Sequence, residues 1–164
     1  MIDPSLQPRI VNAQEGTAYR LGNVLVTFKA VAVETNGAFS IFEMRTEPGA
    51  GMPAHRQRYD DEAVWVLAGS YAFQLGERTV TLEAGDYVFV PRGTVHAYNN
   101  RGDTPARLLI LLTPGGIHER FFAEVGEFVA DRNIPWAVAS SPDLARLLSI
   151  AQKYGIEILA EQTG

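Results

Sequence analysis

The chain has 164 residues, of which 46% are hydrophobic and 20% charged, and its formal net charge is −5. This length and composition fit one folded domain and exclude a disordered chain. The acidic surplus, 19 Asp and Glu against 14 Lys and Arg, argues against a nucleic-acid partner. Because there is no cysteine, disulfides and thiolate metal sites are excluded.

The sequence carries no signal for a membrane or for secretion. No apolar run approaches the roughly 18 residues of a membrane-spanning helix. The segment MIDPSLQPRI at residues 1–10 lacks both the basic start and the apolar core of a secretion signal. We therefore expect a cytoplasmic protein without a membrane partner.

Short β-type segments follow one another from about residue 17 to residue 114. They are rich in Val, Phe, Tyr and Thr, and they are separated by Gly, Pro, Asn or Asp. In chain order these segments are 17–21, 23–33, 38–46, 63–69, 70–75, 78–82, 86–91, 95–100 and 106–114. Many short strands at this spacing predict a barrel or a sandwich.

One hairpin is clear within this series. Tyr71, Phe73 and Leu75 recur with the period of two that is typical of a strand. The letters LGER at residues 75–78 then form a tight turn into the next strand.

After residue 116 the apolar period becomes that of a helix. Helical spacing is found for Phe121, Phe122, Val125, Phe128 and Val129, and again for Leu144, Leu147, Leu148 and Ala151. We expect the first stripe to cover the barrel or a subunit contact. Ser141 is expected to cap the second helix, with Pro142 at its first position and Gly155 ending it in a left-handed conformation.

Four polar side chains form a candidate metal site. His55 and Gln57 are two residues apart, so in a strand they share a face. Glu62 lies beyond the polar turn RYDD and can return antiparallel to meet them, and His96 begins a later strand. Two histidines and one carboxylate are the facial set of non-haem Fe(II) centres, to which Gln57 would add a neutral oxygen. The alternative is that the histidines are hydrogen-bonded structural residues.

Two spaced motifs resemble those of the cupin superfamily. Residues 49–69 read G(X)5HXQ(X)4E(X)6G, similar to the first cupin motif, which normally has histidine where Gln57 stands. Residues 85–100 read G(X)5PXG(X)2H(X)3N and match the second motif at every position. The flanking segments TEPGAGMPAH, TPGGIHERFFAEVG and YGIEIL also resemble single-domain bacterial cupins of the quercetin 2,3-dioxygenase-like group. The resemblance extends from about Tyr19 onward.

This resemblance implies an all-β, double-stranded β-helix (jelly-roll barrel) with metal ligands near one mouth. We predict a single domain over residues 1–164, with a barrel core at about 17–114 and a helical tail at about 116–160. Gly69, Gly85 and Gly93 are expected in turns that need a positive φ, with Pro91 fixing the bend before His96.

The predicted ligands are His55, Gln57, Glu62 and His96, around a divalent metal ion. An amide oxygen in place of an imidazole favours Fe or Mn, and Ni, Co or Zn remain candidates. The alternative is an empty pocket in which Gln57 is hydrogen-bonded to its neighbours.

Other side chains are assigned by strand parity. Five side chains are expected either to line a substrate pocket or to belong to the hydrophobic core: Tyr98, Phe42, Met44, Val64 and Val66. We expect five others to lie outside the site, with Arg56 and Arg58 paired to Asp60, Asp61 or a partner subunit: His118, Trp65, Asn100, Arg56 and Arg58.

Three functions fit these residues. The first is a metal-dependent, dioxygenase-like oxidoreductase that acts on a small aromatic or enolisable substrate, with Glu62 as catalytic base. The second is a non-catalytic cupin that binds a small ligand, and the third is a sugar or keto-acid isomerase. Because fold analogy alone does not rank chemistries, all three stay open.

The sequence also predicts an assembly. The segment NVLVTFKAVAV at residues 23–33 carries more apolar surface than one small barrel readily hides. We expect a two-fold homodimer in which the N-terminal strands pack on, or pair with, the partner.

Overall fold

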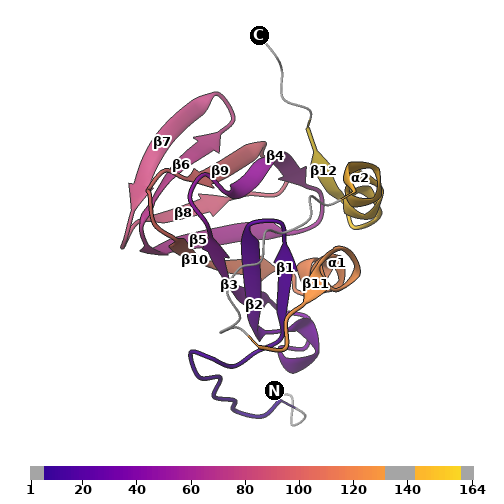
Figure 1. The fold of residues 1–164 in the computed structure, drawn as a ribbon. Coiled ribbons are helices and arrows are strands. Elements are labelled where there is room, and N and C mark those ends of the chain that lie inside the picture. Colours follow the sequence, from indigo (N-terminus) through magenta and orange to yellow (C-terminus); the bar gives the residue numbers. More distant parts are fainter. Residues whose placement is uncertain (1–5, 132–142, 160–164) are drawn as a thin grey trace.

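The computed structural model describes residues 6–131 and 143–159, and the statements below refer to that part of the chain. Two antiparallel sheets lie face to face, and two short helices cover one side of the barrel that they form (Figure 1). The predicted all-β barrel with two C-terminal helices is confirmed.

The strands and helices follow in chain order. The strands are β1 (Ala18–Leu21), β2 (Val24–Ala30), β3 (Ser40–Thr46), β4 (Gly51–Gln57), β5 (Asp61–Ala68), β6 (Ser70–Leu75), β7 (Arg78–Glu83), β8 (Tyr87–Val90), β9 (His96–Asn100), β10 (Ala106–Thr113), β11 (Glu127–Phe128) and β12 (Ile156–Ile158). The helices are the 3-10 helix η1 (Ala32–Glu34), α1 (Ile117–Val125) and α2 (Leu144–Lys153). One sheet has the order β11-β1-β2-β3-β10-β5-β8, and the other has the order β12-β4-β9-β6-β7.

Alternating burial explains why these segments are strands. In β3, Phe42 and Met44 face the interior and are only 2% and 1% exposed, while the residues between them are half-buried. In β10, Leu108 and Ile110 alternate in the same way and lie opposite Met44 and Phe42. The inner faces of the two sheets thus form one hydrophobic core.

The predicted hairpin and turns are confirmed. Strand β6 pairs with β7 along its whole length. Gly69 has a φ of 83°, and a Cβ atom there would lie 2.5 Å from the Cβ of Ala106. This position therefore needs glycine for its backbone conformation and for its space. Gly85 and Gly93 also have positive φ values, 99° and 82°.

The single strand predicted for residues 23–33 is wrong in its second part. Strand β2 ends at Ala30, and Ala32–Glu34 form the short helix η1. The backbone N–H of Ala32 donates to Glu119 Oε1 of α1 at 2.8 Å. Glu34 Oε2 accepts from the backbone N–H of Val31 at 3.3 Å. The first of these bonds spans 87 residues, so the local apolar pattern could not reveal it.

The first predicted helix is confirmed as α1, but it is shorter than the apolar spacing suggested. Gly126 ends it, and Phe128 belongs to β11, where it pairs with Tyr19 of β1 and is 62% exposed. A Cβ on residue 126 would lie 2.7 Å from the carbonyl oxygen of Phe122, so glycine suits this tight exit. Val129 of the predicted stripe also lies beyond the helix, where its backbone N–H donates to the carbonyl oxygen of Ala18 at 3.0 Å. The part of the stripe within α1 does cover the barrel, since Phe121 and Phe122 are each 1% exposed.

The second predicted helix is confirmed as α2. The expected cap Ser141 and the expected first residue Pro142 lie outside the described residues. The helix begins at Leu144 after Asp143, whose side chain accepts from the backbone N–H of Arg146 at 3.2 Å. Gly155 has a φ of 73°, as predicted for the residue that ends the helix.

The tail is not purely helical. After α2 the chain forms β12, which joins the second sheet and pairs with β4. In the described part of the chain, neither α1 with 9 residues nor α2 with 10 is long enough to cross a bilayer.

The predicted contact through the N-terminal strands stays a prediction. Residues 24–28 of β2 are buried in their own chain, whereas Val33 of the same segment is 86% exposed. Large apolar side chains are also exposed on β5 and on the edge strand β8. They are Trp65 (37%), Leu67 (39%), Tyr87 (51%) and Phe89 (51%), and the rings of Trp65 and Tyr87 lie 4.8 Å apart.

We propose that this outer face of β5 and β8 is the contact of a two-fold homodimer. An aromatic side chain buries 150–250 Å² when it is fully covered. Covering the exposed fractions of Trp65, Tyr87 and Phe89 would therefore bury roughly 250 Å² of surface. That is a substantial share of the ~800 Å² per partner of a standard interface. The free edge of β8 also allows two copies of this strand to pair.

We expect light scattering at micromolar concentration to give twice the mass of one chain. Phe89→Glu places a charge in the contact and should give monomers. Phe128→Glu, at a ring that is even more exposed (62% against 51%) and lies at the opposite edge of the same sheet, should leave the dimer intact. The opposite pattern would place the contact on the N-terminal strands, and a monomeric parent protein would contradict the dimer itself.

Candidate metal centre

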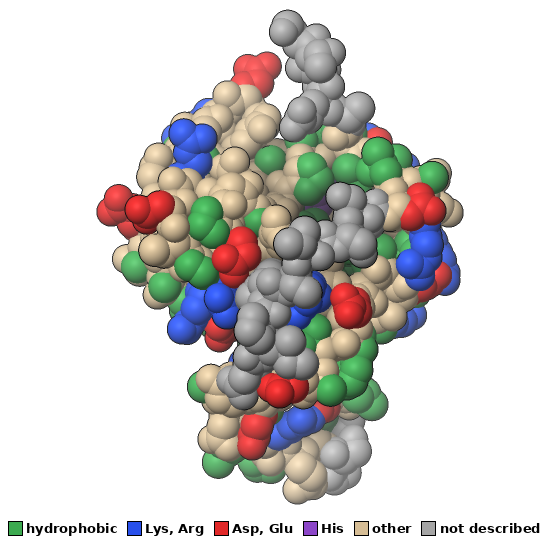
Figure 2. Space-filling view, in the orientation of Figure 1, with side chains coloured by type: hydrophobic (Ala, Val, Ile, Leu, Met, Phe, Trp, Pro, Cys, Tyr) green, Lys and Arg blue, Asp and Glu red, His purple; other side chains and the backbone are tan. Residues whose placement is uncertain are grey.

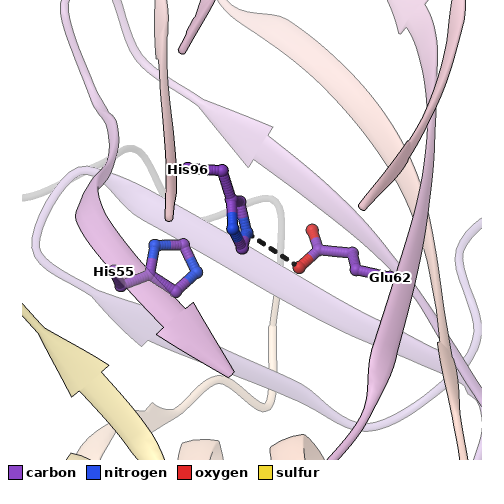
Figure 3. A group of neighbouring side chains, drawn as sticks. All are labelled: His55, Glu62 and His96. Atoms are coloured by element: carbon purple, nitrogen blue, oxygen red, sulfur yellow. Dashed lines mark hydrogen bonds and ion pairs between the residues drawn. The ribbon is translucent and has the colours of Figure 1, made fainter. Parts of the chain in front are cut away.

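Three of the four predicted ligands converge inside the barrel. His55 on β4, Glu62 on β5 and His96 on β9 offer ligand atoms that all lie within 4.8 Å of one another. Each of the three residues is at most 2% exposed. Their side chains point toward one another from separate strands (Figure 3).

Strand pairing accounts for this convergence. In the second sheet β4 and β9 are neighbours, and His55 lies directly opposite His96. Glu62 belongs to the other sheet, on the strand that follows β4 after a short turn. All three are inward-facing positions of their strands, so the barrel interior brings them together.

Hydrogen bonds orient both imidazole rings. Nδ1 of His55 lies 2.8 Å from the carbonyl oxygen of Pro53, and Nδ1 of His96 lies 3.0 Å from that of Thr94. A carbonyl oxygen can only accept, so the proton of each neutral ring is on Nδ1. In a neutral ring each Nε2 therefore carries the free lone pair, which is the arrangement that metal-binding histidines have. In the metal-free centre the Nε2 of His96 donates to Glu62 only when its ring is protonated, and that proton must leave before the ring binds a metal.

Glu62 supplies one occupied and one free oxygen. Its Oε2 accepts from Gln57 Nε2 at 2.6 Å and lies 3.3 Å from His96 Nε2. Its Oε1 is buried and has no hydrogen-bond partner among the described residues. A buried carboxylate oxygen without a donor is costly, and a cation would satisfy it. Two imidazole lone pairs and this oxygen fit a divalent metal ion.

The charges of the three side chains are coupled. Burial, followed by the nearby His96, lowers the pKa of His55 to about 4. Burial also acts to lower the pKa of His96, but the hydrogen bond and charge of Glu62 outweigh it and raise that pKa above its usual value. For Glu62, burial acts to raise the pKa, and the bond and charge of His96 lower it overall. Near neutral pH the metal-free centre thus contains an ionised Glu62 and a neutral His55.

Gln57 and His118 lie beside these three residues. Gln57 presents its amide nitrogen to Glu62, and the same nitrogen lies 3.2 Å from His118 Nε2. The expectation that His118 lies outside the site is therefore wrong. Helix α1 carries this side chain into the barrel mouth, where it is 7% exposed and close to Asp60, with 2.9 Å between Nδ1 and Oδ2. Gln57 as an oxygen ligand stays a prediction.

The five predicted pocket residues are all in the hydrophobic core. Their exposed fractions range from 0% to 4%, for Val64, Met44, Val66, Phe42 and Tyr98. Phe42 reaches the centre, because its ring stacks on that of His118 at 6.3 Å. The hydroxyl of Tyr98 donates to the sulfur of Met44 at 3.6 Å. Their role in binding a substrate stays a prediction.

Two residues that were predicted to lie outside the site do so. Trp65 is 37% exposed and faces away from the centre, as its parity indicated. Asn100 is structural, since its amide donates to the carbonyl oxygens of Thr46 and Thr104 at 3.2 and 2.8 Å.

The predicted pairing of Arg56 with the RYDD acids is wrong. Arg56 binds Glu157 of β12, with 2.8 Å between Nε and Oε2, because β12 lies beside β4. Asp61 binds Arg92 at 2.8 Å instead. The partner of Arg58 stays a prediction.

Comparison with known proteins agrees with this geometry. The family model for the cupin domain matches residues 42–112. The polyketide synthase protein CurC of Streptomyces cyaneus is 30% identical over 112 residues, which cover 66% of this chain and 71% of that protein. The chain belongs to the cupin superfamily.

Two further similarities extend this assignment. Quercetin 2,3-dioxygenase of Bacillus subtilis (strain 168) is 26% identical over 120 residues, or 73% of this cupin. This cupin spans only 35% of the length of that relative. A structure described as a predicted oxalate decarboxylase of Thermotoga maritima, 24% identical, has a TM-score of 0.60 over 65% of this chain and 99% of that chain. At that identity the similarity concerns the fold alone.

We expect His96→Ala to lose its metal. It removes one of three strong donors, so affinity should fall by more than the roughly 100-fold that loss of an outer hydrogen-bond partner costs. Gln57→His should instead tighten Zn, Ni and Co, because imidazole suits those ions better than an amide. Competitive metal titration with thermal melts as a folding control measures both. Equal uptake by folded wild type and His96→Ala would mean that this centre does not exist.

We also expect metal binding at pH 5.5 to release one proton rather than two. The raised pKa of His96 keeps its ring protonated at this pH, whereas the lowered pKa of His55 leaves its ring neutral. Below the pKa of His96, affinity should therefore fall about tenfold for each pH unit. Calorimetric titration in buffers of different ionisation enthalpy counts the released protons. A count of two would show that His55 titrates as an ordinary histidine.

Proposed function

We propose that this cupin is a metal-dependent, dioxygenase-like oxidoreductase that acts on a small aromatic or enolisable compound. The observation that carries the proposal is the buried set of His55, Glu62 and His96, with two lone pairs and one unpartnered carboxylate oxygen. A bound Fe or Mn ion would polarise the oxygen atoms of an enol and exchange electrons with O2. In such a reaction both atoms of O2 enter the organic product.

Glu62 suits the role of catalytic base. Its lowered pKa keeps it ionised at neutral pH, and its Oε1 has no hydrogen-bond partner among the described residues. A carboxylate oxygen has two lone pairs, so Oε1 would keep one when the other binds the metal. An enol or phenol that entered the centre could transfer its hydroxyl proton to this second lone pair. The adjacent side chain of Gln57 holds Oε2, so Oε1 would face both the metal and the substrate.

A cavity near the centre suits an aromatic compound. It is apolar, has a volume of about 170 Å³ and lies beside α1, lined by residues that include Phe121, Phe122 and Pro53 but by none of the three converging ligands. The rings of Phe121 and Phe122 lie 6.4 and 6.5 Å from that of His118. A cavity of this size is comparable to the ~150 Å³ that accommodates benzene. The named relatives point the same way, to quercetin and to polyketides.

A small area of histidine surface is visible between other side chains on one face of the molecule (Figure 2). Of the three histidines, His118 is the most exposed, at 7%. Exposed imidazole surface supports access of a small compound to the neighbourhood of Gln57, which lies 3.2 Å from His118.

We expect the Fe- or Mn-loaded protein to consume O2 when a flavonol or another enediol is added. Glu62→Gln, measured at saturating metal, should lower the rate by roughly 100-fold or more because it removes the base. His96→Ala should be inactive. Glu157→Gln changes a carboxylate outside the centre and should retain the full rate. The measurement is oxygen uptake together with product mass.

The other two functions predict different outcomes. A compound that binds to the metal-loaded protein without O2 uptake and without chemical change would support the non-catalytic binding cupin. Conversion of a sugar or keto acid under anaerobic conditions would support the isomerase. Either result would contradict the dioxygenase.

A further inference from the structure

A row of buried polar groups leads away from Glu62. Gln57 Nε2 donates to Glu62 Oε2 at 2.6 Å and lies 3.2 Å from His118 Nε2. On the far side of the imidazole, Nδ1 lies 2.9 Å from Asp60 Oδ2, a close contact that is not aligned as a hydrogen bond. Gln57 is 2% exposed, His118 7% and Asp60 1%. We refer to Asp60, His118 and Gln57 as the polar relay.

The relay has one consistent arrangement of protons. A carboxylate only accepts, so the group of Gln57 that faces ionised Glu62 must be the amide nitrogen. The second hydrogen of that nitrogen points to His118 Nε2, which must then hold a lone pair. The proton of the ring is consequently on Nδ1, on the side of the ring where Asp60 lies, and the negative charge of that carboxylate favours this tautomer although the contact is not aligned as a hydrogen bond. In this arrangement the amide oxygen of Gln57 points away from Glu62.

Helix α1 is firmly attached at the point where it carries His118. The next residue, Glu119, accepts from the hydroxyl of Ser40 on β3 and from the backbone N–H of Ala32 at 2.8 Å. The ring of His118 also stacks on Phe42 with an angle of 26° between the planes. These contacts fix the imidazole independently of Gln57, so it can hold the amide in one orientation.

We propose that the polar relay makes Gln57 a positioning residue for Glu62 and not a metal ligand. Asp60 and His118 hold the amide so that its nitrogen, and not its oxygen, faces the centre. The centre then has three protein ligands, His55, Glu62 and His96, and the place of a fourth is left to substrate or water. This inference rests on the metal centre of the proposed function.

The test is metal affinity, measured with Co(II) by competition against a chelator. His118→Leu removes the acceptor that orients the amide, and Gln57→Met removes the amide itself. Each should weaken Co(II) binding about 10- to 100-fold, the usual cost of losing a partner that orients a ligand. Because both changes break the same row, the double variant should be no weaker than the weaker single variant.

Two variants separate positioning from mere support of the fold. His118→Gln places an amide oxygen near the position of Nε2 and should restore affinity to within about threefold of wild type. Leu108→Ala removes a fully buried side chain of β10, which lies opposite Met44 and Val66 and not opposite a residue of the relay. It should lower the melting temperature and leave Co(II) affinity unchanged.

The visible absorption spectrum of the bound Co(II) gives a second readout. Wild type, His118→Leu and Gln57→Met should all give the spectrum of the same number of protein ligands. A change in Gln57→Met alone, with additive losses in the double variant, would show that Gln57 is a ligand and overturn the relay.

Failure of the relay and failure of the metal centre give different results. If His96→Ala loses Co(II) while His118→Leu and Gln57→Met bind it as wild type does, the centre exists and the relay is wrong. If folded wild type binds no divalent metal, the proposed function and the relay are both overturned.

Discussion

The burial of a negative charge at Glu62 is the constraint on which the site depends. A carboxylate inside a barrel loses its hydration, and the loss is tolerated only if charged or polar partners replace the water. His96 and Gln57 provide such partners at Oε2, and Oε1 has none among the described residues. The same charge raises the pKa of His96. The ionisation of the whole centre therefore follows from one buried carboxylate.

Strand β4 connects the metal centre to the rest of the fold. It carries His55 and Gln57 on its inner face, and it lies between β9 and β12 in the second sheet. Strand β12 pairs directly with residues 55–57. Helix α2 leads into β12, so the C-terminal tail, far away in sequence, supports the strand that presents the ligands. The tail thus stabilises the centre as well as covering the barrel.

The sequence could predict the features that depend on the local hydrophobic period and on one strand turning back beside the previous strand. His55, Glu62 and His96 were identifiable because inward parity and one antiparallel turn bring them to one face. His118 was not, because its position depends on how α1 packs, through contacts such as that of Glu119 with Ala32. The available signal was scarcity, since the chain has only 3 histidines. Phe128 misled the helix assignment because its spacing is helical although Gly126 ends the helix.

The exchange of histidine for glutamine in the first motif is more than the loss of a ligand. An imidazole at position 57 would offer a single lone pair or a single hydrogen at its inner nitrogen, whereas the amide nitrogen of Gln57 offers two hydrogens. It can therefore reach Glu62 and His118 at once, at 2.6 and 3.2 Å. His118 complements that second hydrogen, and Asp60 lies on the far side of its ring, with both residues buried. A variable position of the first motif and a residue beyond both motifs thus suit an amide at position 57, which makes the glutamine part of a connected polar structure.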